Sequence, residues 1–433
     1  MKTFELKDFI KTKNNAKKHA EEEINFFVKN LDNFNQEKIT AWLRAVKKHG
    51  LDDDEVTNLT LAMAKSGAVL SWEELEPTID KHSSGGIGDK ITLLFAPLIA
   101  AYGINFPKLS GRSLGITGGT IDKLESIKGL KTNLSIKEIK EQVTKIKLAI
   151  SAATNNLAPA DKKLYAIRNV TGTIDSIPLI ASSIMSKKIA GGARNIILDV
   201  KAGSGAFMKD TESASILAKK MVAIGKRLDR NTKALITNMD EPLGHNIGNS
   251  LEIIEVLEIL SGKEVGDLIE ITIRLAREAI ILINGNVETH RGMSSLDEKL
   301  QRLLLRGDAL KKFEELINMQ GGDLNNGFKK ADYVELMRSN YDGIIQEINA
   351  NVIGEIVFEL GAGRKNINDS IDHSVGIVLL KKTEDLVKRG ESLIEVHAKS
   401  KQDVDIIKDK LLSAIKIGNE KPKKQKLIYE VLS

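Results

Sequence analysis

Residues 80–90 read Asp-Lys-His-Ser-Ser-Gly-Gly-Ile-Gly-Asp-Lys, and they combine a Lys-His pair, two hydroxyl groups and three glycines in one short segment. Glycines allow backbone N–H groups to close around phosphate oxygens because no Cβ stands in the way. Lys81 and Ser83 can add an ammonium group and a hydroxyl donor. The segment is not a Walker loop, since Lys90 is followed by Ile91 rather than by Ser or Thr. It indicates an anion-binding loop, with an ordinary turn as the alternative.

Short β-prone runs after residue 76 each lead into a polar, glycine-containing loop, and a helical pattern usually follows the loop. Four of these runs stand out, at residues 79–80, 106–109, 196–200 and 234–237. Ligands of open α/β sheets bind in the crevice beyond the carboxyl ends of the strands. We therefore expect the four loops that follow these runs to converge on one site.

The remaining segments indicate two further units. Apolar residues recur at helical spacing over residues 21–29, 36–48 and 52–65, and again between residues 159 and 192, where Pro178 stands near a helix start. From about residue 335 the pattern changes to β-rich stretches, at residues 351–359 and 374–380, which indicate a mixed α+β unit without a catalytic constellation. We predict an α/β protein with a separate helical lobe and three domains: a helical domain (1–70 plus 160–192), an α/β phosphate-binding domain (76–155 plus 195–330) and a C-terminal α+β domain (335–433).

The composition of the 433 residues excludes several classes of protein. The absence of cysteine rules out disulfides, thiolate metal sites and a cysteine nucleophile, and it fits a cytoplasmic protein. No apolar run approaches a membrane span, and residues 1–25 lack the apolar core of a signal peptide. The net charge is only +5, and no aromatic residues interleave with the lysine clusters at 11–18 and 421–426, so we expect no nucleic-acid partner.

The helical stretch after Pro178 carries a second group of candidate residues. Ser183 and Lys187 are four residues apart and share one helix face, where they can read one edge of a flat ligand; the alternative is a solvated face. The planar fork of Arg168 suits a carbonyl acceptor, with a surface ion pair as the alternative. His82 titrates near working pH and can donate to a leaving group, and a packed histidine is the alternative.

Residues 108–125 form a second glycine-rich stretch, Lys-Leu-Ser-Gly-Arg-Ser-Leu-Gly-Ile-Thr-Gly-Gly-Thr-Ile-Asp-Lys-Leu-Glu. Thr120 precedes a helical run, and a helix N-terminus there would face a bound anion favourably. Ser110 and Thr120 are therefore phosphate candidates. The alternative is that both only cap or terminate local structure.

Five runs of this sequence closely resemble the pyrimidine-nucleoside phosphorylase and thymidine phosphorylase family: DKHSSGGIGDK, KLSGRSLGITGGTIDKLES, LAPADKKLYAIR, TIDSIPLIASSIMSKKIAGGA and LDVKAGSGAFMK. They occur in the family order and at similar spacing, and the resemblance extends from about Glu21 to the segment SIDHSVGIVLLKK. It implies the two-lobed nucleoside phosphorylase fold, in which a small helical lobe and a large α/β lobe close over a cleft. It also implies a C-terminal α/β region and a homodimer.

The resemblance implies reversible phosphorolysis of uridine, thymidine and deoxyuridine to the free base and (deoxy)ribose 1-phosphate, with inorganic phosphate as co-substrate and no organic cofactor. Carried over residue by residue, the phosphate site falls on Lys81, Ser83, Thr92, Lys108, Ser110 and Thr120. The base-recognition site falls on His82, Arg168, Ser183 and Lys187. Lys81 and Lys108 would hold the phosphate, and negative charge on the departing base would be stabilised by Arg168, Lys187 and His82. Because the two ligands lie on different lobes, closure must precede the chemistry.

Lys108 bears on specificity, because relatives restricted to deoxyribose tend to carry an apolar residue there. The resemblance thus implies that uridine is accepted alongside thymidine. Three departures affect the pocket: Ser84 replaces a threonine but keeps the hydroxyl, Ile116 stands where histidine is common, and Ala153 replaces a common glutamine.

The resemblance also implies a potassium site built from Gly88, residue 90, Leu243, residue 246 and Glu255. Here these two positions are Lys90 and Asn246. An ammonium group at residue 90 would substitute for the bound cation and pair with Glu255. We predict weak or absent potassium dependence.

Three alternatives stay open. In the first alternative, the chain is a phosphorylase restricted to thymidine. In the second it is a phosphoribosyltransferase of the related fold, but the acidic pair that a pyrophosphate–magnesium site needs is missing beside the glycine loop. In the third it is a non-catalytic nucleoside-binding protein, which would keep affinity for uracil without turnover.

Overall fold

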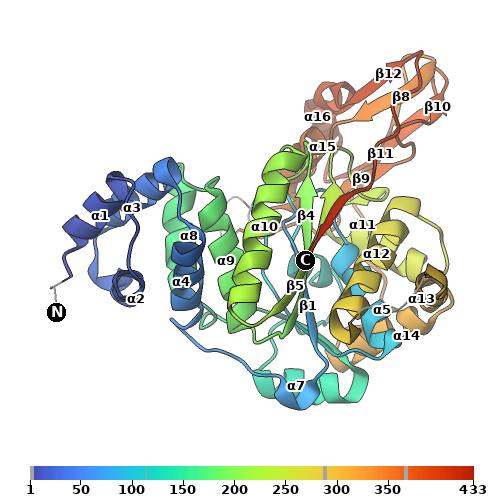
Figure 1. The fold of residues 1–433 in the computed structure, drawn as a ribbon. Helices are drawn as coiled ribbons and strands as arrows, with labels where there is room; N and C mark the ends of the chain where they lie inside the picture. The colour runs from blue at the N-terminus through green and yellow to red at the C-terminus, as the bar shows by residue number, and fades with distance from the viewer. Residues whose placement is uncertain (1–3, 114, 286–289, 365–368) are drawn as a thin grey trace.

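The computed structural model describes residues 4–113, 115–285, 290–364 and 369–433, with the side chains of 290–294 left aside. Leu114, in the second glycine-rich stretch, lies outside the described residues. The chain forms a helical group at the N-terminus, a central α/β part and a C-terminal unit (Figure 1). Among the described residues, no helix combines the length and the apolar character that a membrane span needs.

A four-stranded sheet in the order β1-β4-β5-β13 forms the centre of the molecule (Figure 1). β1 (Ile79–Ser83), β4 (Asn195–Ala202) and β5 (Asn231–Asn238) are parallel, whereas β13 (Ile428–Leu432) pairs antiparallel with β5. A second parallel pair, β2 (Phe106–Ser110) and β3 (Leu148–Ala152), continues beside β1 through a parallel bridge between Thr78 and Asn105. The carboxyl ends of β1, β2, β4 and β5 therefore point the same way, and the four polar loops gather at one edge, as predicted.

Successive residues of β4 pack into two different hydrophobic cores. Ile196 and Leu198 belong to a core shared with α10 (Thr211–Arg227) and the helical group, whereas Ile197 belongs to the core on the other face. Burial on both faces explains the unbroken apolar run at residues 196–198 of this strand. The helices of the second core include α5 (Ile91–Tyr102), α11 (Asn249–Leu260), α12 (Gly266–Asn284), α13 (His290–Leu305) and α14 (Asp308–Met319). α7 (Ile136–Ile146) precedes β3 and packs against it.

Two separate segments build the helical group, seen at the left of Figure 1. The first contributes α1 (Leu6–Asn14), α2 (Glu21–Lys29), α3 (Gln36–His49) and α4 (Asp53–Ala64), and the second α8 (Pro159–Thr171) and α9 (Ile177–Ala190). α8 packs against α3 and α9 against α4, with Phe27, Trp42 and Met185 in one core. Because this core continues into α10 and the sheet, the domain boundaries stay a prediction.

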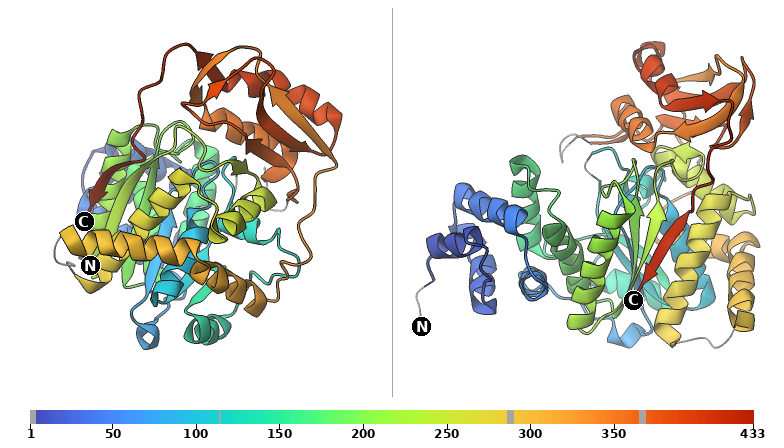
Figure 2. Two further views of the ribbon diagram at one scale, coloured as in Figure 1. Left: turned by 90° about the vertical axis from the view of Figure 1, so that its right-hand side faces the viewer. Right: turned by 45° about the horizontal axis from the view of Figure 1, so that its top comes forward.

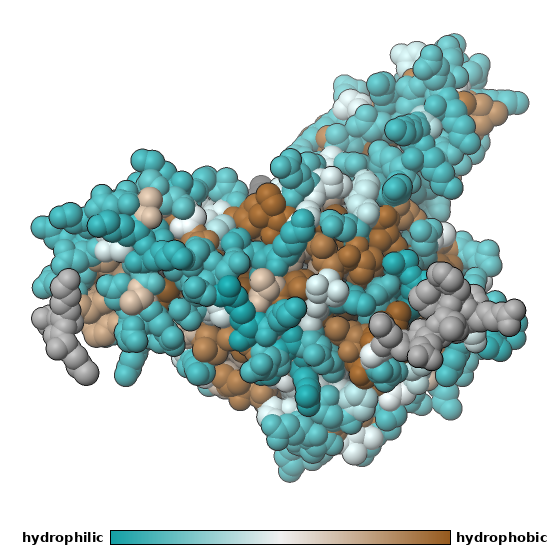
Figure 3. Space-filling view, viewed as in Figure 1, coloured by the Kyte–Doolittle hydropathy of each residue, from teal (hydrophilic) through white to brown (hydrophobic). Residues whose placement is uncertain are grey.

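The C-terminal unit stands away from the helical group (Figure 2). Its two sheets have the orders β10-β8-β12 and β6-β9-β11-β7. The strands are β6 (Asn246–Ile247), β7 (Tyr333–Arg338), β8 (Gly343–Ile348), β9 (Gly376–Leu379), β10 (Leu386–Val387), β11 (Ser392–Ala398) and β12 (Ile415–Gly418), and α16 (Lys401–Ser413) packs on β11 and β7. Figure 3 shows polar residues over much of both outer units, with hydrophobic residues exposed between them.

Residues 351–359 are helical, so the prediction of a β-rich stretch there is wrong. α15 (Ala350–Val357) continues into a π-helical turn, Phe358–Ala362. Val and Ile suggested a strand, but the buried Ile353 and Ile356 are three residues apart, on one helix face. The side chain of Asn349 caps the helix by accepting a hydrogen bond from Val352 N at 3.1 Å.

Candidate active site

The Lys-His pair lies in strand β1 and not in the loop after it. The prediction that the strand ends at residue 80 is wrong, because residues 81–83 pair with residues 197–199 of β4. Lys81 is fully buried, and its Nζ lies 3.2 Å from Asp199 Oδ2 and 3.3 Å from Thr92 Oγ1. The sheet, rather than a flexible loop, therefore fixes Lys81.

The first glycine loop (residues 84–89) closes on the hydroxyl group of Ser83. This hydroxyl donates to Asp89 Oδ2 and accepts a hydrogen bond from Gly85 N at 3.2 Å. Gly88 has a φ of +70°, and a Cβ on it would lie 2.5 Å from Leu243 O. Glycine is thus required at Gly88 both for the turn and for contact with the loop after β5. Ser84 ties the start of the loop to β4, since its Oγ accepts a hydrogen bond from Lys201 N at 2.8 Å.

Strand β2 brings Lys108 and Ser110 to the same edge of the sheet. Lys108 is buried, and its Nζ donates to Asp80 Oδ1 at 2.8 Å. The second glycine loop (residues 111–113 and 115–119) then leads into α6 (Thr120–Leu124). Gly119 is the N-cap of α6, and the Thr120 side chain makes no capping hydrogen bond, so the alternative that Thr120 caps the helix is wrong. Ser110 and Thr120 both keep partial exposure at this edge.

Among the described residues, six buried lysines surround the carboxyl ends of the strands: Lys81, Lys90, Lys108, Lys123, Lys188 and Lys201. Their carboxylate partners are Asp80 (for Lys108 and Lys188), Asp199 (for Lys81 and Lys201), Glu252 (for Lys123) and Glu255 (for Lys90). Asp89 is a fifth carboxylate; burial raises its pKa, but nearby lysines hold the pKa well below its usual range. Buried lysines are rare unless paired. Lys90 and Lys123 each have a carboxylate of their own, whereas the other four ammonium groups lie against three carboxylates, those of Asp80, Asp89 and Asp199. This excess of positive charge suits an anion.

Lys108 and His82 both have lowered pKa values. Burial lowers the pKa of the Lys108 ammonium group to about 7, with Asp80 opposing this shift and Lys188 adding to it. A bound phosphate would favour the charged form of Lys108. Burial also holds the pKa of the half-buried His82 imidazole well below its ordinary value, and so do four nearby ammonium groups, those of Lys188, Lys108, Lys187 and Lys81. His82 is therefore a neutral hydrogen-bond donor and acceptor at neutral pH.

The predicted base-recognition residues Ser183 and Lys187 lie on α9, as expected for residues four apart. Lys187 Nζ donates to Ser183 Oγ at 3.0 Å and to the buried Asp161 Oδ2 at 2.5 Å. The Lys187 side chain remains 37% exposed, so its ammonium group is held in place yet open to a ligand. Asp161 was absent from the predicted site.

Arg168 differs from the open fork that the sequence suggested. Its guanidinium is almost fully buried and donates to three backbone carbonyls, those of Thr173 (3.4 Å) and Ile174 (2.8 Å) in the α8–α9 connection and of Leu179 (3.0 Å) in the first turn of α9. A surface ion pair, the alternative, is therefore wrong. Nη1 and Nη2 each carry a second N–H, so contact with a base carbonyl stays a prediction.

Asp80 and Lys188 connect the two halves of the site, and sequence reasoning missed both. Asp80 Oδ2 accepts from Lys188 Nζ at 2.6 Å, while Asp80 Oδ1 accepts from Lys108. Lys188 follows Lys187 on α9, whereas Asp80 and Lys108 lie in the sheet. The adjacent lysines of α9 were the sequence feature that could have revealed this link. The Lys187 side chain is partly exposed, whereas Lys188 is buried against the sheet.

Lys90 lies where the resemblance implies a potassium ion. It is fully buried, and its Nζ donates to Leu243 O (3.0 Å), Asn246 O (2.8 Å) and Glu255 Oε2 (2.6 Å). Burial would lower the pKa of Lys90, but the carboxylates of Glu255 and Glu252 raise it above its ordinary value. The implied ligands thus hold an ammonium group, and the residues present do not fit a bound potassium ion.

Family models match most of the chain. Residues 75–309 match the glycosyl transferase family, a/b domain, and residues 344–418 match the pyrimidine nucleoside phosphorylase C-terminal domain. The α/β part, whose buried lysines at the strand ends suit an anion, is thus a glycosyltransferase domain.

Relatives define the family more closely. Pyrimidine-nucleoside phosphorylases of Staphylococcus haemolyticus and Geobacillus stearothermophilus are 44% and 41% identical, covering 95% and 98% of this chain and 95% and 99% of theirs. That of Bacillus subtilis is 42% identical, covering 98% of this chain and 99% of its own. The chain belongs to the pyrimidine-nucleoside phosphorylase family.

A solved structure is similar at the level of the fold. The anthranilate phosphoribosyltransferase of Thermus thermophilus aligns with a TM-score of 0.56 and 16% identity, over 72% of this chain and 99% of that chain. This likeness concerns the fold alone, and it confirms the predicted α/β class with a separate helical lobe.

Proposed function

We propose that this chain is a pentosyltransferase that catalyses the reversible phosphorolysis of pyrimidine nucleosides to the free base and (deoxy)ribose 1-phosphate. One observation carries the proposal: the excess of buried ammonium groups at the ends of β1 and β2 lies next to the Ser183–Lys187 edge of α9. The first feature suits phosphate and the second suits the polar edge of a pyrimidine. Family membership supports the same reaction.

In the forward direction a phosphate oxygen forms a bond to C1′ while the bond from C1′ to the ring nitrogen breaks. The bonding electron pair leaves with the pyrimidine, which takes up one proton, and the hydrogen phosphate that has bonded to C1′ gives one up, so charge and protons balance. Lys187, fixed by Asp161 and Ser183, supplies a cation where this charge develops. His82, being neutral, donates a hydrogen bond without adding charge. We assign the holding of phosphate to Lys81, Ser83, Thr92, Lys108, Ser110 and Thr120.

The first test is release of uracil from uridine and of thymine from thymidine, with and without inorganic phosphate. We expect phosphate-dependent release from both nucleosides. Release from thymidine alone would contradict the specificity assigned to Lys108 and favour the thymidine-restricted alternative. A folded protein that binds uracil but releases no base would favour the non-catalytic alternative.

We further propose that Lys90 makes added potassium unnecessary, because its ammonium group already occupies the oxygen ligands. Wild-type turnover should be equal in potassium phosphate and in tetramethylammonium phosphate. In Lys90→Thr a gap lined by oxygen atoms replaces the ammonium group, so potassium chloride should raise the melting temperature of this variant more than tetramethylammonium chloride does. Wild-type activity that collapses without potassium would refute the proposal.

A homodimer and a cytoplasmic location belong to the same proposal. Exposed hydrophobic side chains on the helical group support a protein contact there: Phe26 on α2, and Tyr165 and Val170 on α8, are 44%, 44% and 70% exposed. Sedimentation velocity tests the dimer, and cell fractionation tests the location.

A further inference from the structure

One segment of the C-terminal unit touches all four loops of the site. This docking segment comprises residues 350–364, that is α15, the π-helical turn and two residues after it. At the first glycine loop, Gly354 packs so closely on Ile87 that a Cβ on Gly354 would collide with the Ile87 side chain. At the loop after β4, a Cβ on Gly205 would lie 2.5 Å from the Cβ of Ala350.

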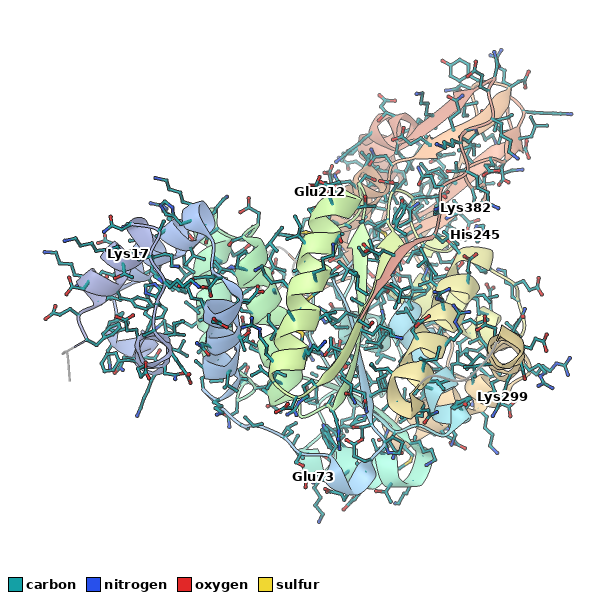
Figure 4. All side chains as sticks on the ribbon, viewed as in Figure 1. Lys17, Glu73, Glu212, His245, Lys299 and Lys382 are labelled. Atoms are coloured by element: carbon teal, nitrogen blue, oxygen red, sulfur yellow. The ribbon has the colours of Figure 1, made fainter. Side chains whose placement is uncertain are left out.

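The same segment makes backbone hydrogen bonds to the other two loops. Ala350 N donates to Asp240 O in the loop after β5 at 3.2 Å, and Gly115 N of the second glycine loop donates to Arg364 O at 3.2 Å. Lys382 and His245 add a further contact between the C-terminal unit and the loop after β5, and both are labelled in Figure 4. Lys382 Nζ donates to Pro242 O at 2.7 Å, and His245 Nδ1 lies 2.8 Å from Leu379 O.

The contact leaves little free space. A cavity of about 20 Å³ lies under the docking segment and is lined by residues that include Ile87, Ile116, Val357 and Phe358. Such a volume holds about one water molecule and no substrate. Ile116, which stands where the resemblance implies histidine, is partly buried and packs against the hydrophobic core around this cavity. The surface is therefore a structural contact and not a second ligand site.

Arg364 reaches past this contact to the start of α6. Its Nη1 lies 2.5 Å from Asp122 Oδ1, and the two side chains are 11% and 4% exposed. Asp122 Oδ2 in turn accepts from Ser113 N at 2.8 Å, inside the second glycine loop. Asp122 also crowds Gly119, since a Cβ on Gly119 would lie 2.5 Å from Asp122 Oδ2. Asp122, which is held by Arg364, thus contacts the second glycine loop at Ser113 and at Gly119, the residue before Thr120.

We infer that the C-terminal unit clamps the four loops, and that Arg364 is a positioning residue for phosphate, acting through Asp122 on the second glycine loop. The inference rests on the proposed function for its phosphate site. Arg364 has no place among the predicted site residues, and the C-terminal unit was expected to carry no catalytic constellation. A charged pair with one partner in each unit makes the loop geometry depend on docking.

The experiment compares Arg364→Met and Arg364→Lys with the wild type, using phosphate and uridine as varied substrates. We expect Arg364→Met to raise the KM for phosphate about tenfold, with the KM for uridine within about twofold of the wild type. Arg364→Lys should fall between, because lysine keeps the charge but loses the planar fork. Combining Arg364→Met with Asp122→Asn should add little to the single change, since both act on one link.

Arg277→Met is the matched control, because Arg277 is 14% exposed and its Nη1 lies 2.8 Å from Asp297 Oδ2, away from the four loops. It should leave both KM values unchanged. The rise in melting temperature caused by phosphate alone gives a readout without turnover: it should be large in the wild type and in Arg277→Met, and small in Arg364→Met. This pattern would support the inference even if no nucleoside is cleaved. Equal phosphate responses in all three proteins, or equal rises of both KM values in Arg364→Met, would overturn it.

Discussion

Replacing Lys187 by methionine is expected to lower kcat/KM for uridine by about 10²- to 10³-fold, the usual effect of removing one fixed donor at a site of developing charge. Lys187 is the ammonium group on the open side of α9, and Asp161 and Ser183 fix its position. Methionine keeps most of the side-chain volume but leaves the buried Asp161 carboxylate without its cation, so we expect a lower melting temperature as well as the loss of turnover. Steady-state phosphorolysis and a melting curve measure the two effects.

Lys162→Met is the control for the Lys187 variant. Lys162 lies on α8, is exposed, and donates its Nζ to Asn155 Oδ1 at 2.9 Å, so its replacement removes one positive charge near the site without touching Asp161. We expect wild-type kinetics for this protein. If kcat/KM for uridine falls less than about tenfold in Lys187→Met, the effect is too small for a group that stabilises charge on the departing base, and that role of Lys187 is wrong.

Replacing Lys90 by methionine is expected to lower the free energy of unfolding by about 3–5 kcal/mol, because the change leaves Glu255 buried without its partner. Both side chains are fully buried, with 2.6 Å between Lys90 Nζ and Glu255 Oε2. Burial alone would raise the pKa of Glu255, whereas Lys90 and two backbone N–H groups hold that pKa below its ordinary value. Urea unfolding followed by tryptophan fluorescence measures the loss.

The double variant Lys90→Met with Glu255→Gln separates lost charge pairing from lost packing. A neutral pair removes the isolated buried carboxylate, so the double variant should recover part of the stability. If the double variant is less stable than Lys90→Met, the stabilisation comes from packing around residue 90 and not from the ion pair.

The sequence predicted most of the sheet and helices because their patterns are local. Helices over residues 21–29 and 36–48 end within one residue of α2 and α3, and Gly50 caps the second. The prediction of a β-rich stretch at residues 351–359 failed because β-branched residues occur both in strands and on buried helix faces. The prediction of a loop at residues 81–83 failed for another reason: these residues are polar, but Lys81 pairs with Asp199 on the neighbouring strand and Ser83 donates to Asp89 in the loop that follows.

The candidate site was predictable where residue type and spacing carry the chemistry, as for Ser183 and Lys187. It was not predictable where a tertiary partner decides the role. Nothing in the local pattern pairs Asp80 with Lys188, or Asp122 with Arg364, because these partners are 108 and 242 residues apart. For the same reason the burial of Arg168 among backbone carbonyls could not be seen in the sequence.

Strand β13 has a consequence for synthesis. It pairs with the outer side of β5 at the edge of the central sheet, although β5 leaves the ribosome long before residues 428–432 are made. Throughout translation of the C-terminal unit that edge has unpaired N–H and C=O groups, which in general invite pairing with another chain. The nascent chain is therefore exposed to misassembly until β13 is released, and a ribosome that stops before residue 428 leaves a product with an open sheet.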